Sequence, residues 1–238
     1  MSVQAKRGFL PSDARDFSAE SLPKLKKAAE EVCYLLDRGY PVTPVTRFVG
    51  DRYQFSERQR LALARTLSQE AAVHARKSRE VTNIAGETLW IDGFNVIIGL
   101  EIAYSQSMLF HCMDGTVRDL AGLHGTYRLI PQTDSAITAL LSTLETSRTA
   151  KAVICLDQPV SNSGRLKQRI FELAEHISFE LDVLIENPVD ALLKTKPLVA
   201  SGDAIILDEC SRWFNLARTV IAQQIGDYPY IDFTPEIK

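Results

Sequence analysis

The stretch TLWIDGFNVII, residues 88–98, decides how the rest of the chain is interpreted. A run of apolar, β-forming residues ends at Asp92, and Gly93 and Asn95 follow before apolar residues resume. This order is typical of a buried parallel strand with polar side chains at its carboxyl end. Binding sites of open α/β sheets form just beyond such strand ends. We therefore expect Asp92 and Asn95 to lie at a functional site.

The same pattern occurs twice more downstream. The segment KAVICLD, residues 151–157, ends at Asp157, and PLVASGD, residues 197–203, ends at Asp203. If the three strands are neighbours, their three carboxylates meet at one edge of the sheet. Like charges at such short range are unfavourable unless a cation lies among them, so the pattern predicts a divalent metal site.

Residues 88–238 alternate between strand and helix patterns, which predicts a parallel α/β sheet flanked by helices. Further strands are expected at 179–186 and 230–233, and helices are expected to begin near 133, 163, 204 and 215. Asp190 lies at the start of a short predicted helix, where the helix dipole favours a carboxylate.

Residues 1–80 have helical spacing instead and predict a small helical domain. A helix from Ser18 or Ser21 to Leu36 is followed by a short helix near 43–49 and a turn at 50–53. The sequence SERQ, residues 56–59, resembles a capping box and predicts a helix to about Ser78. Residues 76–87 are interpreted as a charged linker into the α/β domain.

The helical part is basic and the remainder is acidic. Residues 1–80 contain 15 basic and 10 acidic residues, a net charge of +5, whereas residues 81–238 contain 12 and 20, a net charge of −8. A helix-turn-helix would place basic side chains against nucleic-acid phosphates. A helical bundle with solvated arginines is the commoner explanation of the same spacing. The side chains concerned are Arg47, Arg52, Arg58, Arg60 and Arg65.

Two further segments carry candidate phosphate-binding residues. The segment 99–132 contains Arg118, His124 and Arg128 beside glycines. It is interpreted either as a loop that closes over a phosphate or as an irregular loop whose arginines pair with nearby carboxylates. The segment Ser161, Asn162, Ser163 enters a predicted helix beside Arg165, and a helix start attracts anions. Ordinary helix capping explains the serines equally simply.

Composition excludes several other classes of protein. No apolar run reaches the ~18 residues of a membrane span, and the first 17 residues lack the apolar core of a signal peptide, so we expect a cytoplasmic protein. The four cysteines are far apart in the sequence, which indicates reduced thiols. The four histidines lack zinc-site spacing.

Three motifs resemble the NYN branch of the PIN-like nucleases. They are IDGFNV at 91–96, VDALL at 189–193 and VASGD at 199–203, and Asp157 falls where that family often has another acid. The NYN pattern usually has one more aspartate where this chain has Ile205. The whole chain also resembles an uncharacterised prokaryotic family with a domain of unknown function.

The NYN resemblance implies a PIN-like fold over residues 88–238 and a Mg²⁺- or Mn²⁺-dependent phosphodiesterase that acts on RNA. Asp92, Asp190 and Asp203, with Asp157, would hold the metal, and Asn95 would orient the scissile phosphate. Arg165, Arg118 and Arg128 would bind flanking phosphates.

Two alternatives remain open: a nucleic-acid-binding protein without cleavage, and a metal-dependent phosphohydrolase of a small nucleotide. We expect the protein to bind RNA and not a membrane. The sequence is also compatible with a homodimer.

Overall fold

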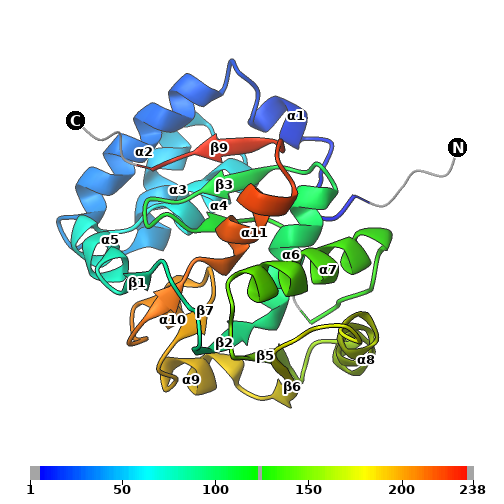
Figure 1. Ribbon diagram of the computed structural model, residues 1–238. Coiled ribbons are helices and arrows are strands. Elements are labelled where there is room, and N and C mark those ends of the chain that lie inside the picture. The colour runs from blue at the N-terminus through cyan, green and yellow to red at the C-terminus, as the bar shows by residue number, and fades with distance from the viewer. Residues whose placement is uncertain (1–5, 123–124, 235–238) are drawn as a thin grey trace, which may run out of the picture.

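A parallel six-stranded sheet forms the centre of the larger part of the molecule in the computed structural model, which describes residues 6–122 and 125–234 (Figure 1). Its strand order is β1-β8-β7-β2-β5-β6, and all neighbours are parallel. The α/β class expected from the sequence is confirmed. The strands are β1 (Glu80–Val81), β2 (Thr88–Asp92), β5 (Lys151–Asp157), β6 (Glu180–Glu186), β7 (Val199–Ala200) and β8 (Trp213–Phe214).

Both faces of this sheet are covered by helices. Ala152, Ile154 and Leu156 of β5 pack on the face covered by α6 (Gly93–Tyr104), α7 (Pro131–Thr146), α8 (Ser163–Leu173) and α11 (Leu216–Gln224). Val153 and Cys155 pack on the opposite face, under α9 (Val189–Lys194) and α10 (Ala204–Leu207). Burial on both faces explains why β5 is apolar throughout and does not alternate with polar residues.

The helical part begins with α1 (Asp13–Asp16) and continues through α2 (Leu22–Leu36), α3 (Val42–Tyr53), α4 (Glu57–Thr66) and α5 (Glu70–Lys77). The capping box predicted at Ser56 is present, since Ser56 and Gln59 exchange hydrogen bonds between side chain and backbone. None of the helices in the described ranges combines the length and apolar character needed to cross a bilayer.

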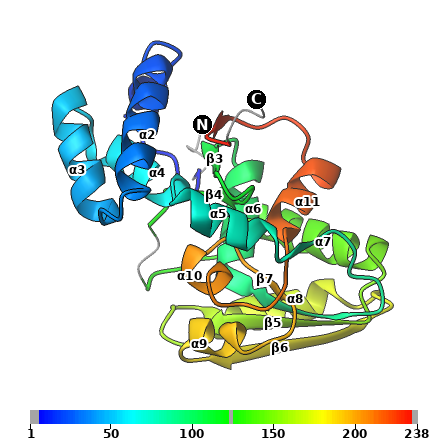
Figure 2. The same ribbon diagram turned by 90° about the vertical axis from the view of Figure 1, so that its left-hand side faces the viewer.

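A second, three-stranded sheet joins the helical part to the α/β part. Strand β3 (Leu109–His111) pairs antiparallel with β4 (Val117–Arg118) and parallel with β9 (Tyr230–Asp232). Phe110 of β3 and Ile231 of β9 are buried in the same apolar cluster as α2, α3 and α4. Figure 2 shows α2 and α3 on the far side of β3 and β4 from the six-stranded sheet. The strand expected at 230–233 therefore forms, but in the small sheet.

Three local expectations from the sequence are corrected by the structure. The turn expected at 50–53 is the last part of α3, and the chain turns at Gln54, whose φ is +54°. Gly50 instead permits close packing, because a Cβ there would lie 2.7 Å from Arg60 Cγ. The helix expected from 56 to 78 is divided into α4 and α5 at Leu67, which is extended and buried.

The third correction concerns residues 76–87, which were expected to be a charged linker. They contain β1, which pairs with β8, and the Arg76 side chain is only 4% exposed. Arg76 therefore lies in the interior of the protein and not in a solvated linker.

Two glycines of α6 provide a matched test of the packing between α6 and β5. A Cβ on Gly93 would lie 2.6 Å from Leu156 Cδ2 and 2.9 Å from the Cys155 carbonyl oxygen. A Cβ on Gly99 would meet no atom within 4 Å. We expect Gly93→Ala to lower the free energy of unfolding by about 1–3 kcal/mol through overpacking.

The control, Gly99→Ala, should raise the free energy of unfolding by about 0.5–1 kcal/mol, because alanine is the better helix former. Urea unfolding followed by circular dichroism measures both. Equal effects of the two substitutions would show that α6 does not approach β5 closely at Gly93.

Candidate active site

Four carboxylates lie around the carboxyl-terminal edge of the six-stranded sheet. Strands β7, β2 and β5 are adjacent and parallel, so Asp92 at the end of β2, Asp157 at the end of β5 and Asp203 after β7 reach the same edge. Asp190 lies in the first turn of α9, which follows the neighbouring strand β6. The sheet order thus brings together the acids that the sequence marked at separate strand ends.

Asp92 is the most buried of the four, with 6% of the residue exposed. It is the N-cap of α6, where its side chain accepts the Asn95 amide hydrogen, and it also accepts a hydrogen bond from Ser201 Oγ at 2.8 Å. The pKa of the Asp92 carboxyl is raised to about 7, mainly by burial. The charges of Asp157 and Asp203 contribute to this increase, and the hydrogen bonds from Ser201 and from the Asn95 backbone oppose it.

Asp157 and Asp190 have raised pKa values as well. Burial is the main cause for each; the charge of Asp190 adds to the effect on Asp157, and that of Asp203 to the effect on Asp190, which Lys194 opposes. Lys194 itself is bound to Glu209 at 2.7 Å. Within residues 6–122 and 125–234, none of the four aspartates forms an ion pair. The described residues therefore leave these four aspartates without an ion pair, and Lys194 offsets the burial and charge effects on Asp190 only in part.

The donor set is of the kind that Mg²⁺ or Mn²⁺ binds, because both prefer carboxylate oxygens. The described residues nevertheless hold no group of three or more acid, His or Cys side chains close enough together to surround one ion. Mg²⁺ is commonly held by one or two carboxylates and several waters, so this wider spacing is compatible with such a site. Ile205, which stands where the NYN resemblance would place one more aspartate, is 56% exposed.

The loop Ser201–Asp203 is fixed to β2 and α6 by polar contacts. Ser201 Oγ accepts the Asp203 amide hydrogen at 3.0 Å while donating to Asp92, and Asn95 Oδ1 accepts the Gly202 amide hydrogen at 2.7 Å. Asn95 is thus held through its oxygen, and its Nδ2 group lacks an acceptor among the described residues. Ser201 connects two of the acids, a role that the sequence argument did not assign to it.

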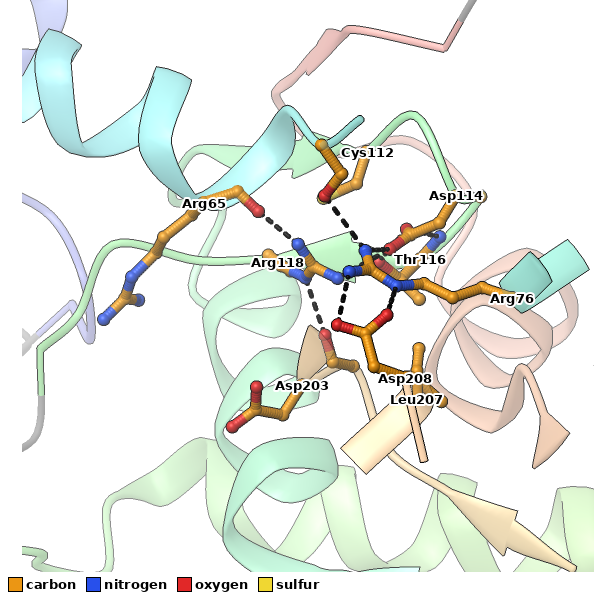
Figure 3. A network of polar contacts seen from close by, with 12 residues as sticks. Arg65, Arg76, Cys112, Asp114, Thr116, Arg118, Asp203, Leu207 and Asp208 are labelled. Atoms are coloured by element: carbon orange, nitrogen blue, oxygen red, sulfur yellow. Dashed lines mark hydrogen bonds and ion pairs between the residues drawn. The ribbon is translucent and has the colours of Figure 1, made fainter. Parts of the chain in front are cut away.

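Arg118, expected to bind a substrate phosphate, is instead engaged within the protein (Figure 3). Its Nε donates to the Gly202 carbonyl at 2.6 Å, its Nη1 to the Arg65 carbonyl, and its Nη2 to Asp114 at 2.7 Å. The structure therefore gives Arg118 a positioning role at the Ser201–Asp203 loop.

Asp114 is the centre of a buried ionic network that the sequence did not reveal (Figure 3). Its Oδ2 accepts from both Arg118 and Arg76, the latter at 2.8 Å, and Arg76 also binds Asp208 through two nitrogens. Burial alone would raise the pKa of Asp114, but Arg118, Thr116 and Arg76 together hold it below its ordinary value. The only signal in the sequence was the turn-forming pair Asp114–Gly115.

The remaining predicted phosphate ligands fall into two groups. Ser161 Oγ and Asn162 Nδ2 donate to the Tyr127 carbonyl, and Ser163 Oγ donates to the Asp157 carbonyl, so these side chains stabilise the loop. Arg128 and Arg165 are exposed and line a cavity of ≈ 460 Å³ together with Asn162. His124 lies outside the described residues.

The arginines of the helical part differ in their availability. Arg58 binds Asp13 and two backbone carbonyls, and Arg60 binds Asp51 and two backbone carbonyls. Arg47 is exposed, and Arg52 is 66% exposed with one ion pair at 3.8 Å. Arg65 lies close to the acidic edge and is considered below.

The raised pKa of Asp92 makes stability depend on pH. The folded chain keeps this proton up to about pH 7, whereas the unfolded chain loses it near the ordinary value of 3.8. The folded state therefore binds more protons in that window, and the free energy of unfolding falls as the pH rises. We expect Asp92→Asn to be more stable than the wild type at pH 8 by up to about 4 kcal/mol, with little difference near pH 4.

Urea unfolding at both pH values, in the presence of a chelator, measures this difference. Asp157 titrates in both proteins, and removing the Asp92 charge also removes its repulsion of Asp157, which adds to the stability gained by Asp92→Asn at pH 8. A constant difference at the two pH values would show that Asp92 is already ionised at pH 4.

Comparison with known proteins gives the chain its family. The protein-family model described as "Domain of unknown function (DUF5616)" matches residues 81–219. A second family model, described as "Protein of unknown function (DUF434)", matches residues 24–79. No solved structure matches significantly. The uncharacterized protein MJ0935 of Methanocaldococcus jannaschii is 36% identical over 185 residues, which cover 77% of this chain and 88% of the relative. This chain therefore belongs to the family of the domain of unknown function DUF5616.

Proposed function

We propose that the protein is a Mg²⁺- or Mn²⁺-dependent ribonuclease with a PIN-like α/β domain. The observation that carries the proposal is the set of four aspartates at one sheet edge that form no ion pair among the described residues, three of them with raised pKa values. A protein gains no stability from repelling carboxylates, so such a group is more simply explained by a cation that binds there.

Asp92, Asp190 and Asp203 are the residues that would hold the ion, with Asp157 beside them. When bound, the divalent cation supplies positive charge that stabilises the developing negative charge on a phosphate undergoing hydrolysis. Ser201 keeps Asp92 and the Asp203 backbone in register through its two hydrogen bonds. Asn95, fixed through its oxygen by Gly202, presents Nδ2 as a donor for a phosphate oxygen.

A nucleic-acid-binding protein without cleavage is the second candidate. The wide spacing of the acids and the exposed Ile205 favour this candidate, because both lower the affinity of the site for a metal ion. It predicts RNA binding that does not require metal and a wild-type protein that leaves RNA intact.

Cleavage assays on mixed-sequence RNA and DNA, with Mn²⁺ titrated from a chelated start, distinguish the two candidates. We expect metal-dependent cleavage of RNA by the wild type and at least about 100-fold slower cleavage by Asp92→Asn, because an ion's stabilisation of the transition state is worth several kcal/mol.

Asp182→Asn is the control, since Asp182 is an exposed acid of β6 that is bound to Lys151 and should leave the rate unchanged. Calorimetry with Mn²⁺ should detect binding to the wild type and to Asp182→Asn. If neither protein binds Mn²⁺ or cleaves RNA, the nuclease proposal is wrong and the binding protein remains.

A further inference from the structure

A cavity of ≈ 330 Å³ lies between the helical part and the acidic edge. One wall comes from the end of α4 through Arg65, and another comes from Asn95 and Asp203. Its volume is at the small end of the range for ligand sites, which suits one phosphate group with its sugar better than an extended ligand. The cavity thus joins a cationic side chain of the helical part to the candidate metal site.

Arg65 has hydrogen-bonding capacity to spare in this cavity. Its Nη1 donates to the Asp119 carbonyl at 2.6 Å, whereas its Nε and Nη2 have no acceptor among the described residues. The Asp119 carboxylate is 3.8 Å from Arg65 and accepts the Ala121 amide hydrogen, so it compensates the guanidinium charge only partly. The Arg65 side chain is 34% exposed. A guanidinium held at one end with free N–H groups is well prepared to bind phosphate oxygens.

The position of Arg65 relative to the acids is fixed by Arg118. This one guanidinium donates to the carbonyl oxygen of Arg65 and to that of Gly202, so the end of α4 and the Ser201–Asp203 loop share a partner. Figure 3 shows the Arg65 side chain and the Asp203 carboxylate extending to the same side of Arg118. The helical part and the acidic edge therefore form one composite site.

We infer that this cavity binds a backbone phosphate of single-stranded RNA, with Arg65 as the charged donor and Asn95 Nδ2 as the neutral donor beside Asp203. The inference rests on the proposed function, which supplies the RNA substrate. In this inference the helical part is not a separate binding module. It contributes one residue, Arg65, to the substrate site. Asn95 and Arg65 bind the anion while the aspartates hold the cation, so opposite charges are bound side by side.

The salt dependence of binding tests this role directly. Each phosphate contact to single-stranded nucleic acid contributes about 0.7 to the slope of log affinity against log salt concentration. We expect Arg65→Gln to reduce the slope by about 0.7 and to weaken binding of a labelled oligouridylate about tenfold at low salt. Fluorescence anisotropy in a chelator, between about 50 and 200 mM salt, measures both without cleavage.

Arg148→Gln is the matched control. Arg148 is exposed and precedes β5, so it lies at the sheet edge opposite the acids. The Arg148→Gln substitution removes the same charge as Arg65→Gln, and it should leave the affinity for oligouridylate and the salt slope close to those of the wild type. If circular dichroism shows that Arg65→Gln is unfolded, Arg65→Lys is measured instead. Lysine keeps the positive charge, so the salt slope should stay the same. It lacks the planar fork of arginine, so the variant should bind the oligouridylate about threefold more weakly than the wild type.

The outcomes separate this inference from the proposed nuclease. If Arg65→Gln loses slope while no protein cleaves RNA in Mn²⁺, the phosphate site stands and the nuclease fails. If the wild type cleaves RNA and Arg65→Gln binds like Arg148→Gln, the nuclease stands and the phosphate site is overturned. Absence of oligouridylate binding by the wild type, or equal affinity of Arg65→Lys and wild type, also overturns it.

Discussion

The sharing of Asp114 by two guanidinium groups is the interaction on which the arrangement of the molecule depends. Asp114 is 1% exposed, and a carboxylate buried to that degree costs several kcal/mol unless it is paired and hydrogen-bonded. Arg76 comes from the end of α5 and Arg118 from β4, so one carboxylate joins the helical part to the small sheet. Arg118 then reaches Gly202, which extends the connection to the acidic edge. Separating the two parts of the chain would break the Arg76–Asp114 ion pair and the hydrogen bond from Arg118 to the Arg65 carbonyl, whereas Arg118 and Asp114 would stay paired.

The chain treats its buried carboxylates in two opposite ways. Asp114 is surrounded by donors, and its pKa is lowered; Asp92 faces other carboxylates and no cation within the described ranges, and its pKa is raised. The first arrangement stabilises the fold, whereas the second works against it. This contrast is the physical ground for treating the edge with Asp92 as a site and the cluster around Asp114 as a scaffold.

The sequence predicted those features that depend on local pattern. Apolar runs that end in Asp92, Asp157 and Asp203 identify parallel strands, and parallel strands must place their carboxyl ends together once they are neighbours. The small sheet was not predictable in this way, because β3 and β9 are short and their pairing joins segments more than a hundred residues apart in the chain. The partner of an arginine is likewise not encoded locally: Arg76 has the sequence surroundings of a linker, yet it is among the most buried polar side chains.

The net charge of the helical part is a weaker argument for nucleic-acid binding than the sequence suggests. Of the five arginines considered for phosphate contacts, Arg58 and Arg60 use their donors on Asp13, Asp51 and backbone carbonyls. A positive charge that is already neutralised attracts a polyanion only weakly, since counterion release requires accessible cations. Among the described residues, Arg65 keeps donors without an acceptor, and it lines the cavity beside Asp203. Two of the three arginines of α4 therefore hold the helix in place, and the third, Arg65, offers donors where α4 meets the sheet edge. Arg47 and Arg52 of α3 remain exposed.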